Sequence, residues 1–458
     1  MPRGFYLLIA GQAISALADN ALLIVAIALL SERGLPLWWA PLLKFAFTVS
    51  YVVLAPVIGP LADAMPKARL MTAMNIVKFT GVAMLLAGAN PLLAFAVVGF
   101  GAAAYAPAKY GLVTEMVGPR QLVAANGWIE VSVVCAALLG TVLGGLLVAD
   151  GLRTSQASVA LGQWLALQPH APASSLQLSM LALLAAYLVS AAMNACVPGS
   201  GARYAPTRIH ALALVRDFHR ANRTLWCDRD GGLSLAITTI FWGVGATLQF
   251  AVLKWATEVL GLSLERAAYL QAAVAVGVIA GAAMAGQRVR LSRAKRVLPA
   301  GVVLGLCMPV VASVDTLWLA VPLLALVGAV GGILVVPLNA LLQHRGYTLL
   351  SAGRSIAVQG FNENLSVLAM LAGYAALVAM DVPIVPLMWG LGLLVAARIA
   401  LLMRRECCLQ RPAACVLGQP ALPRDDWRHL LRRLDARIRR NARRAEDQWK
   451  REPPGGTH

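Results

Sequence analysis

Apolar residues form long runs along this chain, and short polar segments separate the runs. Each run has the length of a membrane-spanning helix, because a hydrocarbon core of ~30 Å requires roughly 20 apolar residues. The pattern predicts an all-α membrane protein with about twelve transmembrane helices. The predicted crossings are residues 5–30, 40–62, 70–89, 92–117, 121–149, 176–197, 233–259, 266–287, 297–314, 317–343, 352–379 and 382–403.

The first run extends from Phe5 to Leu30 and is interrupted by Asp19. A cleavable signal peptide would have a shorter apolar region, followed by small residues at a cleavage site. We therefore expect this run to remain in the protein as a transmembrane helix.

Cationic residues gather in every second connection between the predicted crossings. These connections and the chain ends contain Arg3, Lys67, Arg69, Arg120, the stretch from Arg203 to Arg229, the group from Arg288 to Arg296, Arg345, Arg354 and a basic tail. The alternate connections carry chiefly Arg33, Arg153 and Arg266. Because Lys and Arg are enriched in cytoplasmic loops, this asymmetry predicts that both termini are cytoplasmic.

The polar segment 198–232 divides the chain into two halves of similar pattern. We expect an N-terminal six-helix half at 1–197, a cytoplasmic linker at 198–232, a C-terminal six-helix half at 233–403 and a basic cytoplasmic tail at 404–458. An offset of about 230 residues places Pro107 over Pro337 and Asp19 over Gln249. Internal repeats of this kind are common in transporters, so the two halves are predicted to be pseudo-symmetric.

The tail contributes much of the net charge of +18. Its apolar residues recur at helical spacing among arginines, and they are Trp427, Leu430, Leu431, Leu434 and Ile438. A basic amphipathic helix of this kind is expected to lie on anionic lipid headgroups. A solvated or partner-binding helix is the alternative, and the position of the cations disfavours nucleic acid as a partner.

Composition excludes several other classes of protein. With 59% hydrophobic and 13% charged residues, the chain is too apolar for a soluble domain. Its cysteines form no C-x-x-C pair, so neither a disulfide framework nor a metal site is predicted. No histidine has an aspartate five positions on, as an acyltransferase would require, and no G-x-x-x-x-G-K-[ST] loop occurs. We therefore expect a protein that is not an enzyme and has no cofactor.

Ionisable residues within the apolar runs are the candidate functional residues. A charge at the bilayer centre costs ~2.5–3.5 kcal/mol on insertion scales, so each one needs a partner, a wet cavity or a function. Asp19 lies midway through the first run, is followed by Asn20 and shares a helix face with Ser15. It is expected either to face a central cavity or to bond another helix.

Two further candidates lie in the fourth and eleventh runs. Lys109, beside Tyr110, suits a phosphate or a carboxylate as a point cation. The alternative for Lys109 is an ion pair with Asp19 or Glu363. Glu363 has amide side chains around it, at Gln359, Asn362 and Asn364, and could accept an ammonium group or be held in place by these amides.

Several polar residues are weaker candidates because they lie near predicted membrane ends. They are Glu130, Lys44, Lys78 and Lys254, and snorkelling is the interpretation favoured for Lys44 and Lys78. Asn339 and Gln343 could line a cavity or bond across helices. Gly140, Gly144 and Gly145 are expected to allow close helix packing, although glycine is common in membrane helices in any case.

Several motifs together resemble one family. The segment from Gly59 to Asp63, followed by Lys67 and Arg69, is similar to the loop signature of the major facilitator superfamily, in which an aspartate pairs with loop cations. The segments that resemble the bacterial lysophospholipid transporters within that superfamily are Ala18-Asp19-Asn20-Ala21-Leu22-Leu23, Ala55-Pro56 to Ala62-Asp63, Gly101 to Gly111 with its Pro-Ala-Lys-Tyr-Gly ending, Ala125-Asn126-Gly127, Phe241-Trp242-Gly243, Val335 to Gln343 and Ala357 to Asn364. The likeness covers about the first 405 residues.

This resemblance implies a monomeric major facilitator fold in the bacterial inner membrane. It implies a flippase that moves lysophosphatidylethanolamine and lysophosphatidylglycerol from the outer to the inner leaflet, where an acyltransferase partner restores the missing chain. The expected substrate-binding residues are Asp19, Asn20, Lys109, Tyr110, Gln249, Lys254, Asn339, Gln359, Asn362 and Glu363. The expected conformational-switch loop contains Asp63, Lys67 and Arg69.

The chain departs from the family in two places. Gln249 stands where the family has an arginine, with Lys254 as a displaced substitute, and the tail is longer than usual. A different function also fits the acidic residues, because Asp19 or Glu363 could couple protons to the transport of a soluble solute or drug.

Overall fold

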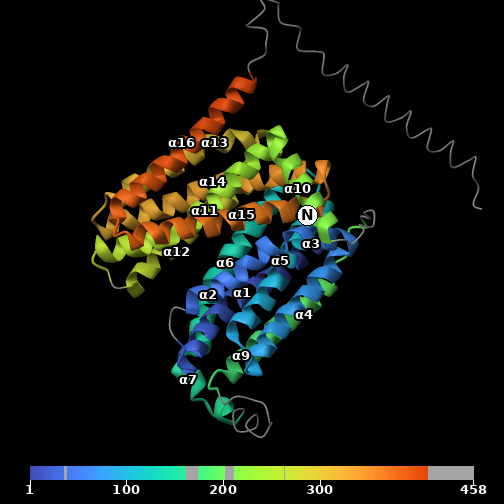
Figure 1. Ribbon diagram of the computed structural model, residues 1–458, viewed down its shortest axis with the longest axis vertical. Coiled ribbons are helices and arrows are strands. Elements are labelled where there is room, and N and C mark those ends of the chain that lie inside the picture. Colours follow the sequence, from blue (N-terminus) through green and yellow to red (C-terminus); the bar gives the residue numbers. More distant parts are fainter. Residues whose placement is uncertain (36–38, 161–173, 202–210, 263, 411–458) are drawn as a thin grey trace, which may run out of the picture. The chain divides into compact units, whose positions relative to one another are not determined.

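The computed structural model describes residues 1–35, 39–160, 174–201, 211–262 and 264–410 (Figure 1). Its elements are α1 (Arg3–Glu32), α2 (Trp39–Val53), α3 (Ala55–Ala64), α4 (Lys67–Leu86), α5 (Pro91–Met116), α6 (Leu122–Val148), α7 (Asp150–Arg153), α9 (Gln177–Ala195), α10 (Ala211–Cys227), α11 (Arg229–Glu258), α12 (Leu264–Arg288), the 3-10 helix η1 (Leu291–Val297), α13 (Leu298–Ala312), α14 (Leu317–Leu349), α15 (Ala352–Ala379) and α16 (Ile384–Gln410). Within the described ranges, 11 helices are long and apolar enough to cross a membrane, or up to 12 if a bent pair is one span. The predicted all-α membrane fold is confirmed.

One predicted crossing, at 40–62, is divided into two helices. α2 and α3 meet at an angle of 65° around Leu54. Pro56 lacks the N–H that would continue the helix, and its ring clashes with the preceding turn. The same proline is tolerated in the first turn of α3, where that N–H would be unpaired in any case. The bend therefore follows from the position of one proline.

The helices pack together both within and between the two halves of the chain. In the first half, α1 packs against α6 and α9, and α4 packs against α5 and α9. In the second half, α12 packs against α14, and α11 packs against α15. The halves meet through α6 against α12 and through α15 against α3 and α5. All of these helices belong to one compact unit, Met1–Leu401, and Leu402–His458 is a separate unit.

Small residues bring several helix backbones into direct contact. A Cβ atom on Gly281 of α12 would lie 2.0 Å from the carbonyl oxygen of Ala329 in α14. In α6, a Cβ on Gly140 would lie 2.5 Å from the carbonyl oxygen of Leu17, so the predicted close packing is confirmed there, as it is at Gly144. It is wrong for Gly145, where the site of a Cβ has no neighbour within 4 Å.

The polar linker between the halves contains a helix that the apolar pattern did not predict. α10 buries Leu214, Phe218, Ala221 and Leu225, which recur at helical spacing on one face. This face packs against Ala55 of α3 and Val358 of α15, so the helix contacts both halves. The predicted amphipathic helix of the tail lies outside the described residues.

Candidate functional site

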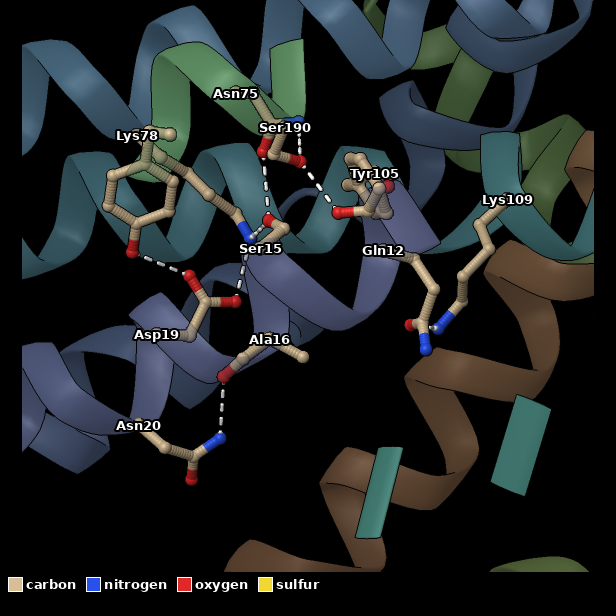
Figure 2. A network of polar contacts seen from close by, with 12 residues as sticks. Gln12, Ser15, Ala16, Asp19, Asn20, Asn75, Lys78, Tyr105, Lys109 and Ser190 are labelled. Atoms are coloured by element: carbon tan, nitrogen blue, oxygen red, sulfur yellow. Dashed lines mark hydrogen bonds and ion pairs between the residues drawn. The ribbon is translucent and has the colours of Figure 1, made fainter. Parts of the chain in front are cut away.

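Asp19 of α1 lies at the centre of a polar network in the first half (Figure 2). Its Oδ2 atom is 2.6 Å from the Nζ atom of Lys78 in α4. Its Oδ1 atom accepts a hydrogen bond of 2.7 Å from the hydroxyl of Tyr187 in α9. The Asp19 side chain is 19% exposed, so a surface of the carboxylate is still accessible. Asp19 therefore joins three helices and is not fully enclosed.

Lys78 is a buried partner of Asp19, and the prediction that it snorkels is wrong. Its side chain is 2% exposed. The Nζ atom also donates to the Ser15 hydroxyl at 3.0 Å and lies 5.3 Å from the centre of the Tyr105 ring. Lys78 is in the middle of α4 on the face that packs inside the first half, where its side chain cannot reach water. By contrast, Lys44 in α2 is exposed.

The network continues from Ser15 through side chains that the sequence analysis did not single out. Ser15 donates to the Oδ1 atom of Asn75 at 2.8 Å, and Asn75 donates to the Ser190 hydroxyl at 2.8 Å. Ser190 in turn donates to the Gly11 carbonyl oxygen at 2.7 Å. Asn75 and Ser190 are both 0% exposed. Their isolation within apolar runs was the available signal, but their partners are set only by the packing of α1, α4 and α9.

Lys109 of α5 is a second buried cation in the first half. It is 8% exposed and donates to the Oε1 atom of Gln12 at 3.2 Å. Its Nζ atom lies 4.3 Å from the centre of the Tyr110 ring. The ion pair considered for Lys109 with Asp19 is not formed, because Asp19 pairs with Lys78. Lys109 is thus held by a neutral amide and an aromatic ring.

Glu363 of α15 presents a carboxylate from the second half. Gln359, one turn earlier, donates to its Oε1 atom at 2.8 Å. The same amide nitrogen donates to Asn339 of α14 at 3.0 Å, which links the two helices. Glu363 is half-buried, whereas Asn339 and Gln359 are buried. Of the three amide side chains expected around Glu363, Gln359 bonds its carboxylate.

The other two amides of this stripe bond elsewhere. Asn362 donates to Asn222 of α10 at 2.9 Å and accepts from the indole N–H of Trp226 at 3.1 Å. Asn364 donates to the Gly360 carbonyl oxygen in its own helix at 2.8 Å. Asn362 therefore faces the linker helix, and its prediction as a substrate contact lacks support from this geometry.

Asn20 and the two candidates in α11 have different surroundings. Asn20 donates to the Ala16 carbonyl oxygen at 2.8 Å (Figure 2). Gln249 is exposed and lines an apolar cavity of about 120 Å³ between α11, α12, α13 and α14. Lys254 lies 3.6 Å from Glu258, one turn further along α11. Lys254 therefore has a carboxylate neighbour near the end of α11, and its role as a substitute for a cation at Gln249 stays a prediction.

The expected switch loop connects the two halves. Asp63 accepts hydrogen bonds from the Ser351 hydroxyl and from the Gly353 amide, the latter at 3.0 Å, at the start of α15. Lys67 pairs instead with Glu115 of α5 at 2.6 Å, with both side chains buried, and Arg69 is exposed. The aspartate of this loop thus bonds across the halves, and its lysine bonds within the first half.

A pair of buried amides also fastens the halves together. Asn126 of α6 and Gln343 of α14 exchange two hydrogen bonds of 2.8 Å each. They are 3% and 1% exposed. Near them, a Cβ on Gly127 would lie 3.1 Å from the Cα atom of Gly286 in α12. The halves are therefore closed at the end where the cationic connections lie.

Comparison with known proteins agrees with this architecture. The sequence profile of the Major Facilitator Superfamily matches residues 8–373. The lysophospholipid transporter LplT of Shigella flexneri is 37% identical over 401 residues, which are 87% of this chain and 95% of that protein. LplT of Yersinia enterocolitica is 38% identical over 386 residues, 84% of this chain and 90% of that protein.

Solved structures share the fold at low sequence identity. The human organic anion transporter MFSD10 is 14% identical with a TM-score of 0.66, covering 87% of this chain and 100% of that structure. A bacterial homologue of the iron transporter ferroportin, in an outward-facing state, is 14% identical with a TM-score of 0.65, covering 88% of this chain and 100% of that structure.

Proposed function

Because the chain belongs to the lysophospholipid transporter family of the Major Facilitator Superfamily, we propose that it moves lysophospholipids from the outer to the inner leaflet of the bacterial inner membrane. The observation that carries this proposal is the similarity to full-length proteins of that name over at least 84% of this chain. We propose that the chain acts as a transporter and not as an enzyme.

The proposed headgroup site combines charges from both halves. Lys109 is a buried cation that donates to a neutral amide and lies against an aromatic ring, so it is suited to a phosphate. Asp19 has a side chain that is 19% exposed and Glu363 is half-buried, and a carboxylate suits the ammonium of an ethanolamine headgroup. Asn20, Tyr110, Asn339 and Gln359 are proposed to complete this site. Gln249 would meet the substrate further along α11. Lys254 lies beside Glu258 and Asn362 bonds α10, so these two residues are less suited to contact the headgroup.

The acyl chain requires an apolar space beside the headgroup site. A cavity of about 410 Å³ lies between α11, α15 and α16, and most of its lining residues are apolar, among them Met370, Leu377, Leu387 and Leu391. The apolar cavity at Gln249 is a second such space in the same half. The charged side chains of Asp19 and Lys109 in the first half suit the headgroup of an amphiphile, and the apolar cavities of the second half suit its acyl chain.

We propose that this structure represents a state open toward the outer side. The halves are bonded by Asp63 with Gly353 and by Asn126 with Gln343, at the end that carries the cationic loops. Those loops are expected on the cytoplasmic side. Release into the inner leaflet would then require these bonds to break. There the lysolipid would meet its functional partner, a lysophospholipid acyltransferase, while the transporter itself acts as a monomer.

Uptake of labelled lysophosphatidylethanolamine into proteoliposomes tests the function. We expect the wild-type protein to move the lipid across the bilayer, and Asp19→Asn and Glu363→Gln to lower the rate by at least about tenfold, which is 1.4 kcal/mol of lost interaction. Normal transport by both variants would remove these residues from the site. A wild-type protein that leaves the lipid where it was, but takes up a soluble solute when a pH gradient is imposed, would support the proton-coupled alternative.

A further inference from the structure

The ion pair between Asp19 and Lys78 is unequally exposed. Lys78 is 2% exposed, whereas Asp19 is 19% exposed. A substrate can therefore reach the carboxylate but not the ammonium. The cation still acts on the substrate, because a charge in a poorly solvated interior is weakly screened.

We infer that Lys78 is a positioning residue that sets the headgroup charge accepted at Asp19. This inference rests on the proposed lysophospholipid function and deepens it. Lys78 compensates the charge of Asp19, so that the first half presents an oriented carboxylate without a net negative charge at this point. A zwitterionic phosphoethanolamine and an anionic phosphoglycerol headgroup can then both be accepted.

The geometry fixes the carboxylate while leaving room for a ligand. Lys78 binds Oδ2 at 2.6 Å and Tyr187 binds Oδ1 at 2.7 Å. Two ionised carboxylate oxygens provide about four acceptor positions, so two remain for a substrate ammonium or hydroxyl. Both kinds of headgroup carry such donors. The carboxylate is thus held in one orientation before the substrate arrives.

Lys78 itself is held too firmly to follow the substrate. Its Nζ atom donates to Ser15 at 3.0 Å, and Ser15 is tied through Asn75 to α9. The rings of Tyr105 and Tyr187 lie 5.3 and 5.8 Å from the same nitrogen, a distance at which aromatic faces stabilise a cation. Lys78 therefore acts through Asp19 and not by direct contact with the headgroup.

Competition between two labelled lysolipids tests this inference. Proteoliposomes receive equal amounts of lysophosphatidylethanolamine and lysophosphatidylglycerol, and the ratio of their transport rates is measured.

Lys78→Met leaves a net negative charge and is expected to raise the ethanolamine-to-glycerol ratio by about tenfold. Asp19→Asn leaves a net positive charge and is expected to lower the ratio. The double variant Asp19→Asn/Lys78→Met has no net charge, so its ratio should return to within about twofold of wild type, with both rates reduced. Lys44→Met, at an exposed lysine of α2, is the matched control and should leave the ratio unchanged.

The outcomes separate this inference from the proposed function. If Lys78→Met lowers both rates equally and the ratio stays at the wild-type value, Lys78 is only structural and the inference is overturned. If Lys78→Met does not accumulate in the membrane, the comparison of Asp19→Asn with the double variant decides, because equal ratios in these two would also overturn it. A wild-type protein that transports neither lysolipid would instead refute the proposed function.

Discussion

The two halves of the protein hold their membrane-embedded polar residues in different ways. In the first half, the network around Asp19 joins α1, α4 and α9 through successive hydrogen bonds. In the second half, Glu363 is bonded by Gln359 of its own helix, which also donates to Asn339 of α14, and by Thr238 of α11. Several buried polar atoms of α11 and α15, among them Trp242 Nε1, Thr239 Oγ1 and Gln359 Oε1, lack a hydrogen-bond partner within the described part of the chain.

This difference indicates that the two halves differ in rigidity. A fully bonded buried network is rigid, because each member loses a partner if it moves. Unpaired buried polar atoms are costly, and a ligand that supplies the missing donor or acceptor can satisfy them. We therefore propose that the first half is pre-organised for one part of the headgroup. The second half has unpaired polar groups on α11 and α15, and we propose that it can adjust to substrates that differ in headgroup and chain.

The largest test of this comparison is removal of the central carboxylate from each half. Asp19→Leu leaves Lys78 buried without its counter-ion, and this should destabilise the protein by about 3–5 kcal/mol. Glu363→Leu should cost much less, because the Gln359 amide keeps its bond to Asn339. Unfolding of the purified variants in mixed detergent and denaturant micelles measures both effects. Equal losses would show that the two halves are held alike.

An intermediate effect is expected at the contact between the halves. Asn126→Leu leaves the buried Gln343 amide without its two bonds, which should destabilise this closed end by about 1–3 kcal/mol. The double variant Asn126→Leu/Gln343→Leu removes both amides and should recover part of that loss. Labelling of a cysteine introduced at Ala124, which faces Gly286 across this contact, reports opening of this end. Unchanged labelling in Asn126→Leu would show that the amide pair does not hold the halves together.

The smallest effect is expected in the second half, at Trp242. Trp242→Phe removes an indole N–H that has no hydrogen-bond partner among the described residues, so stability should change by less than about 1 kcal/mol. If the N–H donates to the substrate, lysolipid affinity should fall about three- to tenfold while the folded protein remains. Transport rates across a series of lysolipid concentrations measure this. A clear loss of stability with unchanged affinity would mean that Trp242 is an ordinary packing residue.

The fold could be predicted from the sequence because the bilayer imposes a simple requirement. Each crossing needs a continuous apolar run, and the prediction of 352–379 coincides with α15, Ala352–Ala379. Two features escaped this rule. Pro56 breaks a run that is continuous in hydropathy, and α10 has too few apolar residues to stand out, although their spacing marks one face.

The candidate site could be predicted only in part. Asp19, Lys109 and Glu363 stand out because ionisable residues are rare in apolar runs. Their partners could not be derived, since Lys78 lies 59 positions from Asp19 and meets it only through the packing of α1 against α4. The direction in which the Asn362 side chain points could have been predicted from the sequence. On a helix it points about 100° away from Glu363, and this turns it toward α10.

The bonds of α10 are unevenly shared between the two halves. Asn222 and Trp226 bond Asn362 of α15, and Asp228, which follows the helix, pairs with Arg345 of α14 at 2.5 Å. On the other side, Phe218 and Ala221 belong to the same apolar cluster as Ala55 of α3. When the end that carries the cationic loops separates, α10 should therefore remain attached to the second half and slide off α3, because the described residues of α10 and α3 share apolar contacts and no hydrogen bond. This separation would expose the apolar surface of α3 around Ala55. That surface would border the path by which the substrate leaves, where the acyl chain of the lysolipid could cover it before water does.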